Sequence, residues 1–274
     1  MSQPARYADT AGLAELYDLV PAYSQRQDVA FYVDTCRAHG GKVLELGCGT
    51  GRTLLPIAAA GLTVVGLDLS EHMLARCRDK VAVQPQDVQA RIRLVRARMT
   101  EFGLDDTFAT VIIPFRPFQH LIAVEDQLAC LRCVKAHLAT GGRLVFDCFQ
   151  VNLRKITDPQ RTEETEDLPE FGLPDGRRLR RCNRIAATHP AQQYNDVEII
   201  YYLTDAAGLT QRVVHRFPFR YFFRYELEHL LARAGFEAEH VYGDFDRSPL
   251  GDASPEMIHV ARKAAGSTGT EAAA

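Results

Sequence analysis

The stretch Val43-Leu44-Glu45-Leu46-Gly47-Cys48-Gly49-Thr50-Gly51, followed by Val64-Val65-Gly66-Leu67-Asp68, decides the fold of this chain. Each segment begins as a short apolar run, which is typical of a strand buried in a parallel sheet. The alternating glycines after the first run allow a sharp turn into a helix and a close approach of backbone to ligand. Asp68 ends the second run at the spacing typical of a carboxylate that bonds ribose hydroxyls. Together the segments predict a nucleoside-containing cofactor.

The sequence around these two runs alternates between strand and helix patterns. Strands are predicted over 42–46, 63–67, 91–95, 109–113 and 142–148, and helices over 51–60, 70–79 and 125–138. Alternation of this kind is typical of a parallel sheet with helices on both faces. Phe236–Tyr242 and Met257–Arg262 are expected to pair and complete a seven-stranded, mostly parallel sheet.

The pattern changes after residue 147. Residues 151–176 are polar and rich in acidic side chains and proline, which favours a loop or weak helix over the site. Three strand-like segments follow at 178–188, 193–204 and 210–220, with a plausible hairpin turn at Asp205–Gly208. We predict an antiparallel β insert that acts as a lid, after which a helix over 224–234 returns to the main sheet.

These patterns divide the chain into five parts. Two helical patterns, over 10–20 and 25–38, precede the first strand. The predicted parts are an N-terminal helical cap (1–40), a cofactor-binding core (41–150), the insert (151–223), the C-terminal part of the core sheet (224–264) and a disordered tail (265–274).

Composition limits the class of protein. The chain has 274 residues and a net charge of −3, which disfavours non-specific binding to nucleic acid or anionic membranes. The start carries no signal-peptide pattern, and seven scattered cysteines favour reduced thiols, so we expect a cytoplasmic protein without disulfides. Cys130 and Cys133 form a lone Cys-x-x-Cys within a helix pattern. No second ligand pair accompanies it, so no metal site is predicted.

The chain resembles the class I S-adenosylmethionine (SAM)-dependent methyltransferases. The resemblance lies in Glu45–Arg52 as the first motif, Gly66–Leu74 as the second, and Leu138–Phe146 as the turn into the fifth strand. It implies a Rossmann-like fold with SAM as cofactor. It also implies that Gly47 and Gly49 approach the methionine portion of SAM. The other implied contacts are Glu45 to the ammonium group, Asp68 to the ribose, Leu69 to the adenine, and Cys48, Gly51, Met73, Met99 and Pro114 around them.

One position departs from the family pattern beside the adenine. Arg98 stands where relatives often have an acidic residue, and a guanidinium cannot accept a hydrogen bond from the adenine amine. We therefore expect the Met99 backbone and apolar packing to hold the adenine, with Arg98 otherwise turned to solvent.

The segment after the fourth strand supplies the candidates nearest the transferred methyl group. His120 is the candidate general base, since imidazole suits proton removal near neutral pH, although a structural histidine is an alternative. Phe115 or Phe118 is expected to face the sulfonium cation or else to pack in the core. Tyr17 is a second catalytic candidate, in the cap that resembles the family's lid, and Tyr7 is a weaker one.

Arginine and tyrosine are frequent in and around the insert. This frequency indicates either a pocket for an anionic group of the acceptor or a solvated strand face. Alternation places Arg216 and Arg220 on one face of a strand. With Phe115, Arg116, Phe118 and Tyr221, they make up the substrate-binding candidates.

The sequence therefore predicts a SAM-dependent methyltransferase of a small-molecule acceptor, with nitrogen slightly favoured over oxygen as the methylated atom. An enzyme that methylates amino groups of DNA bases is disfavoured, because residues 114–117 lack the Asn/Asp-Pro-Pro-aromatic motif of such enzymes. Two alternatives remain: an NAD(P)-dependent Rossmann oxidoreductase, which Arg52 at the last glycine position disfavours, and a non-catalytic SAM-binding protein. We expect no nucleic-acid or membrane partner, and a monomer or homodimer.

Overall fold

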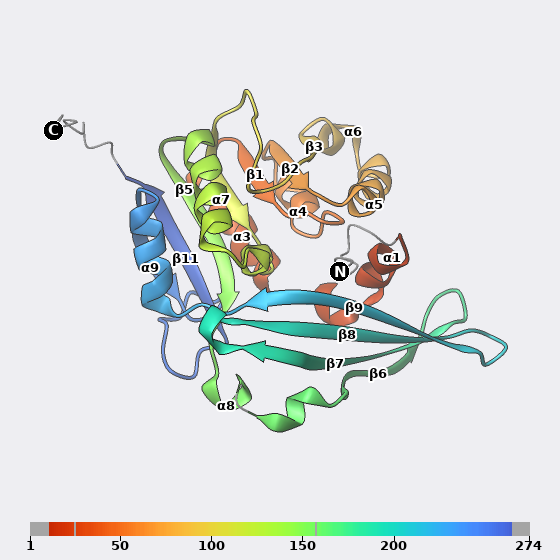
Figure 1. Ribbon diagram of the computed structural model, residues 1–274. Helices are drawn as coiled ribbons and strands as arrows, with labels where there is room; N and C mark the ends of the chain where they lie inside the picture. The colour runs from red at the N-terminus through yellow and green to blue at the C-terminus, as the bar shows by residue number, and fades with distance from the viewer. Residues whose placement is uncertain (1–10, 25, 157, 265–274) are drawn as a thin grey trace.

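A computed structural model describes residues 11–24, 26–156 and 158–264, in which two sheets organise the chain (Figure 1). The larger sheet has the order β10-β11-β5-β4-β1-β2-β3. Its strands are β1 (Val43–Leu46), β2 (Val64–Asp68), β3 (Ile92–Arg96), β4 (Phe108–Ile113), β5 (Leu138–Phe149), β10 (Phe236–Tyr242) and β11 (Glu256–Lys263). All neighbouring pairs among β1–β5 are parallel, whereas β11 runs antiparallel to both β5 and β10. The predicted Rossmann-like α/β fold is confirmed.

Helices cover both faces of this sheet and bury a separate apolar core on each. One core includes side chains of α3 (Asp28–His39), α4 (Leu54–Ala59) and α5 (Glu71–Ala82). The other includes α7 (Val124–His137) and α9 (Arg224–Arg233). The short α6 (Gln86–Gln89), which the sequence did not predict, precedes β3. Because each fully buried aliphatic or aromatic side chain contributes roughly 1.5–3 kcal/mol, these two layers hold the carboxyl edge of the sheet in place.

The second sheet is antiparallel, with the order β6-β7-β8-β9. Its strands are β6 (Thr165–Gly172), β7 (Arg178–His189), β8 (Tyr194–Thr204) and β9 (Thr210–Arg220). The predicted turn joins β8 to β9, where the Asp205 carboxylate accepts hydrogen bonds from the backbone N–H groups of Ala207 and Leu209, each at 2.9 Å. In Figure 1 this sheet lies across the carboxyl edge of the parallel sheet.

The expectation of a loop or weak helix over 151–176 is wrong for its second half. After α8 (Leu153–Ile156) and the 3₁₀ turn η2 (Pro159–Thr162), the chain forms β6 and pairs with β7. The acidic side chains that suggested a loop have arginine partners instead: Asp167 pairs with Arg181 at 2.9 Å and Glu170 with Arg178 at 2.9 Å. The acidic side chains therefore belong to β6, an edge strand whose charges are paired with arginines of β7.

The N-terminal helices α1 (Ala11–Leu19) and α2 (Pro21–Ser24) bridge the two sheets. Leu13, Leu16 and Val20 pack in one cluster with Leu179 and Tyr201 of the insert. On its other side, α1 is held by Asp18, whose carboxylate accepts hydrogen bonds from the side chains of three residues of the core. These are Thr50 at 2.6 Å, Lys80 at 2.7 Å and Arg76 at 3.1 Å. Tyr7 and the tail over 265–274 lie outside the described residues.

The helices of the described segments include none with the length and apolarity that a membrane span requires.

Candidate active site

The turn after β1 has the backbone geometry that its glycines permit. The Gly47 N–H donates to the Leu67 carbonyl at 2.7 Å, which ties the turn to β2. Gly47 has φ +71°, and a Cβ added there would lie 2.9 Å from the Pro117 ring. Any other residue would be strained in conformation and would push against the chain that follows β4. The turn thus keeps its backbone exposed to a ligand.

Asp68, at the end of β2, accepts hydrogen bonds from backbone N–H groups around it. The N–H groups of Gly49 and Ser70 each donate to it at 2.8 Å, on different carboxylate oxygens. Burial raises the pKa of this carboxyl, and the backbone donors oppose that shift. A carboxylate offers about four acceptor sites and Asp68 lines the cleft, so it can also accept a hydrogen bond from a ligand hydroxyl such as those of the SAM ribose.

Glu45 is the second acidic group of the turn and is only 3% exposed. Its Oε2 is buried and has no hydrogen-bond partner among the described residues. Burial raises the pKa of Glu45 to about 8, an effect that the positive charge of Arg52 opposes. An unsatisfied buried carboxylate oxygen is costly, and a cationic donor such as the ammonium group of SAM would satisfy it. The residues of the turn therefore fit SAM.

A cleft of about 1420 Å³ extends from this turn to the inner face of the insert. It is larger than the roughly 300–1,000 Å³ typical of a single ligand, so it accommodates a cofactor and a second molecule together. The predicted residues that line it are Tyr17, Gly47, Gly49, Asp68, Leu69, Met73, Met99, Pro114, Phe115, Arg116, His120 and Arg220. These side chains and glycines come from both walls, so the structure brings the predicted cofactor and acceptor candidates together.

The chain after β4 is held in an unusual conformation beside the cofactor turn. Phe115 and Arg116 have φ +68° and +72°, which non-glycine residues rarely adopt. The Phe115 N–H donates to the Asp147 carboxylate at 2.7 Å, and Tyr32 donates to the same oxygen at 2.6 Å. Asp147 has 0% exposure, so this anchor lies entirely inside the protein. Two consecutive left-handed residues persist because the surrounding contacts over-determine them.

Two arginines extend this anchor. Arg26 donates to Asp147 at 3.2 Å and to Glu256 at 2.7 Å. Arg116 donates to the same Glu256 oxygen at 2.5 Å. Sequence reasoning missed Arg26, Tyr32, Asp147 and Glu256 as part of the site. The one available signal was an acid at the carboxyl end of the buried fifth strand.

The Phe115 ring lies among charged and aromatic groups. The guanidinium groups of Arg26 and Arg52 each lie 4.9 Å from its centroid, and Tyr17 and Tyr23 contact it edge-on at 6.2 and 5.1 Å. Arg52 is itself held by two hydrogen bonds to Asp28, each 2.6 Å. Burial raises the pKa of Tyr17, which therefore stays a neutral phenol at neutral pH. A neutral phenol donates a hydrogen bond but is a poor base.

His120 lies at the end of the 3₁₀ turn η1 (Pro117–His120) and faces the insert. Its ring centroid is 5.1 Å from those of Phe217 and Phe219 on β9. His215 lies on the same face of β9, 4.7 Å from Phe217. Burial lowers the pKa of His215 to about 3, with the charge of His120 adding to the effect, so His215 is neutral at neutral pH. His120 is exposed and lines the cleft, so its imidazole is open to a molecule bound there.

Several predicted residues lie outside the cleft. Glu45, Cys48 and Gly51 belong to the cofactor turn but are not among the residues that line the cleft. Three substrate candidates have other surroundings. Phe118 is 1% exposed and packs in the core against Phe146 and Phe222. Arg216 is the exposed partner of Glu198, on the face of β9 opposite His215 and Phe217, and Tyr221 is 6% exposed beside Phe223. The structure therefore corrects these three candidates, because strand alternation and helix packing turn their side chains away.

The arginine cluster of the insert is ion-paired. The arginines in and around the insert form these ion pairs with carboxylates: Arg177–Glu15, Arg178–Glu170, Arg180–Glu166, Arg181–Asp167, Arg184–Glu198, Arg216–Glu198, Arg220–Glu226 and Arg224–Glu228. Arg220 also donates to the backbone carbonyls of Ile122 and Gln192. These contacts favour the structural interpretation of the cluster over an anion pocket. Arg98, by contrast, lines the cleft near Met99 and is exposed.

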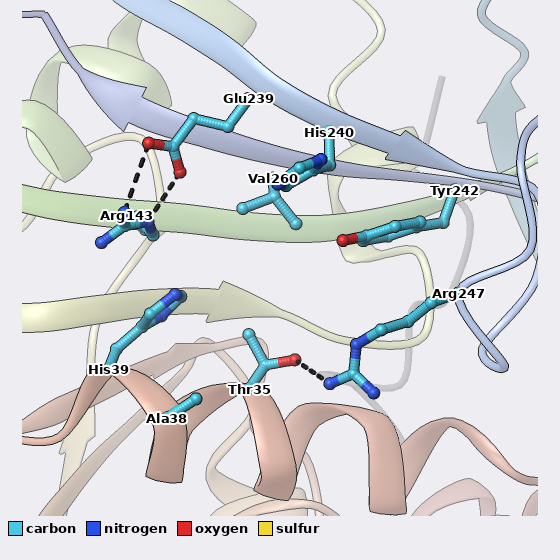
Figure 2. A pocket seen from close by; sticks show the side chains of 9 residues that line it. All are labelled: Thr35, Ala38, His39, Arg143, Glu239, His240, Tyr242, Arg247 and Val260. Carbon is cyan, nitrogen blue, oxygen red and sulfur yellow. Dashed lines mark hydrogen bonds and ion pairs between the residues drawn. The ribbon is translucent and has the colours of Figure 1, made fainter.

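A second, smaller hollow of about 210 Å³ lies between α3 and strands β5, β10 and β11 (Figure 2). Figure 2 shows its polar side chains bonded across it: Arg143 to Glu239, and Arg247 to Thr35. This hollow shares no lining residue with the large cleft. The Arg247–Thr35 hydrogen bond across it connects α3 to the segment between β10 and β11. In the described part of the chain, no group of three or more His, Cys, Asp or Glu side chains is arranged to hold a metal ion.

Comparison with known proteins agrees with this geometry. Residues 43–142 match the family model described as a methyltransferase domain. The chain is 34% identical over 150 residues to the cypemycin N-terminal methyltransferase of a Streptomyces species, covering 54% of this chain and 58% of that protein. It is 32% identical to the dTDP-3-amino-3,6-dideoxy-alpha-D-glucopyranose N,N-dimethyltransferase of Streptomyces fradiae, covering 51% and 54%. The chain thus spans little more than half the length of these curated relatives.

Among solved structures, SAM-bound CalS10 is an amino pentose methyltransferase of Micromonospora echinaspora involved in calicheamicin biosynthesis. It superposes with a TM-score of 0.67 at 26% identity, over 90% of this chain and 96% of that one. The fold, the cofactor turn and these matches show a methyltransferase domain over residues 43–142 that resembles the class I SAM-dependent methyltransferases, and the residues of its turn fit SAM as cofactor.

Proposed function

We propose that this protein transfers the methyl group of SAM to a nitrogen atom of a small-molecule amine. The observation that carries this proposal is the single cleft that joins the Gly47 turn and Asp68 to His120 and the aromatic face of β9. The named N-methyltransferases among its relatives support nitrogen as the acceptor atom. The comparisons offer nothing in favour of a nicotinamide-dependent oxidoreductase.

The reaction needs positioning and one proton transfer. SAM supplies an activated methyl group on a sulfonium. Asp68 would hold its ribose and Glu45 would supply the carboxylate for its ammonium group, while Phe115 and the anchored 114–116 segment shape the wall of the cleft. His120 takes a proton from the ammonium form of the acceptor, which frees the nitrogen lone pair. The lone pair forms the new N–C bond, the S–C bond breaks towards sulfur, and S-adenosylhomocysteine leaves.

The test is release of S-adenosylhomocysteine with a panel of amines, in wild type and His120→Gln. We expect the substitution to lower kcat by about 10²–10⁴-fold and to leave the Kd of SAM unchanged. The matched control is His229→Gln, since His229 is exposed on α9 and does not line the cleft.

Loss of SAM binding or of folding in His120→Gln would show that His120 is structural. A failure of every amine, with SAM still bound, would favour a non-catalytic SAM-binding protein. Saturable binding of NADH without binding of SAM would support the oxidoreductase.

A further inference from the structure

Most arginines on the acceptor side of the cleft already have a carboxylate partner. Arg116 pairs with Glu256 at 2.5 Å, Arg184 with Glu198 at 2.7 Å, and Arg220 with Glu226 at 2.7 Å. Among the described lining residues, this leaves Arg98, beside the cofactor end, and Arg161 as cations without a carboxylate partner. A diphosphate carries at least two negative charges and is typically bound by several free cations or backbone donors. The acceptor side does not offer that set.

The helix end in the cleft wall is also unsuited to an anion. Ile122, Ala123 and Asp126 line the cleft where α7 begins, and the positive end of a helix dipole normally attracts phosphate. Here the first turn carries Glu125 and Asp126, both exposed. Their negative charges take the place of a bound anion. Asp126 presents this charge to the cleft itself, where it attracts a cation and repels a phosphate.

The remaining surface of the acceptor side is aromatic or neutral. Phe149 and Phe219 lie 5.7 Å apart, centroid to centroid, and Phe217 and His120 continue this wall. Asn195 lies at its edge, 7% exposed, and its buried Oδ1 has no hydrogen-bond partner among the described residues. Because Asn195 also lines the cleft, its unsatisfied carbonyl oxygen favours a ligand with an N–H or O–H donor. Aromatic faces add stacking and cation–π attraction.

We propose that the acceptor is a phosphate-free amine that enters as a cation, attracted by Asp126, stacks on Phe217 and Phe219, and donates a hydrogen bond to Asn195. This proposal rests on the proposed N-methyltransferase function and specifies its substrate class. An amino sugar within a finished molecule fits this chemistry, whereas the same sugar linked to a nucleoside diphosphate does not.

The first test needs no turnover. The full-length protein, saturated with S-adenosylhomocysteine, is titrated with inorganic pyrophosphate and with thymidine diphosphate in a calorimeter at low ionic strength. We expect no saturable binding up to about 1 mM, a range that would detect a Kd as weak as about 1 mM. Micromolar binding that Arg161→Ala abolishes would overturn the proposal.

The second test uses whichever amine supports turnover. Asp126→Asn is expected to raise the KM of the amine about two- to five-fold at low salt, with kcat unchanged, and added salt should shrink the difference. Glu125→Gln is the matched control, because Glu125 has the same helix turn and exposure but does not line the cleft.

An equal effect of both variants, or no effect of Asp126→Asn, would overturn the steering role. If no amine is methylated, the proposed function fails, and the diphosphate titration still decides the phosphate question separately.

Discussion

The two walls of the cleft are built in different ways. The cofactor wall binds through backbone atoms and carboxylates that are close in sequence, as in the hydrogen bond from Gly49 to Asp68, 19 residues apart. The acceptor wall and its anchor use side chains from distant segments, as in the ion pair of Arg116 with Glu256, 140 residues apart. The cofactor wall can therefore be recognised from a short sequence motif. The acceptor wall depends on strand register and packing, and a substitution there has consequences that sequence spacing does not show.

Asp147 joins the two walls, and its loss should have the largest effect. Asp147→Ala removes the acceptor of Tyr32 and Phe115 and leaves Arg26 without one of its partners inside the protein. Breaking a buried ion pair typically costs about 3–5 kcal/mol, so we expect a loss of this size in the free energy of unfolding, measured by urea denaturation.

Asp147→Asn keeps an oxygen acceptor for the Phe115 N–H and should lose less stability. If Asp147→Ala unfolds like wild type, the 114–116 segment is held by other contacts and the two walls are independent.

Asp68→Ala acts on the cofactor wall alone. The ribose loses its charge-assisted hydrogen bonding to the carboxylate, so we expect SAM to bind about 1–3 kcal/mol more weakly by calorimetry. Asp68→Asn keeps part of this hydrogen bonding, so its SAM affinity should lie between those of wild type and Asp68→Ala. An increase in the KM of the amine at saturating SAM would contradict the separation of the walls.

Glu45 makes the cofactor wall sensitive to pH. Its pKa is raised from 4.5 to about 8, so the free protein holds it protonated at neutral pH and loses stability as the pH rises between those values. The ammonium of SAM favours the ionised carboxylate. SAM affinity should therefore rise about tenfold between roughly pH 6 and 7, with proton release.

Calorimetry in buffers of different ionisation enthalpy measures that proton release directly. Glu45→Gln has no proton to release and should give a flat profile. A wild-type affinity that falls over this range would mean that another group controls binding.

Phe219→Ala should have the smallest effect, confined to the acceptor wall. Loss of one aromatic contact is worth about 0.5–1.5 kcal/mol, which raises the KM of the amine several-fold with the Kd of SAM unchanged. Phe223→Ala is the control, because Phe223 is 45% exposed and does not line the cleft. Equal effects of the two substitutions would remove Phe219 from the acceptor site.

Much of the fold was predictable because its signals are local. The strands of the insert, the Asp205–Gly208 turn and the helix before β10 all follow from alternation and turn residues. The wrong predictions concern residues whose structure depends on which side chains they contact in the fold. The acidic residues of 151–176 indicated a loop until arginines of β7 and β9 were placed beside them. Phe118 and Phe115 have the same chemistry three residues apart, yet only the 3₁₀ turn after β4 determines that Phe118 enters the core.

The local sequence specifies the cofactor turn, since a positive φ requires glycine and a strand end places Asp68, and both conditions act within about 25 residues. It likewise specifies the alternation that yields two sheets. Only the packing of those sheets brings Asp147 under Phe115, turns Arg216 away from the cleft and sets His120 against the aromatic face of β9. These outcomes depend on contacts between segments far apart in the chain, whose free energy is shared over the whole fold and leaves no local pattern.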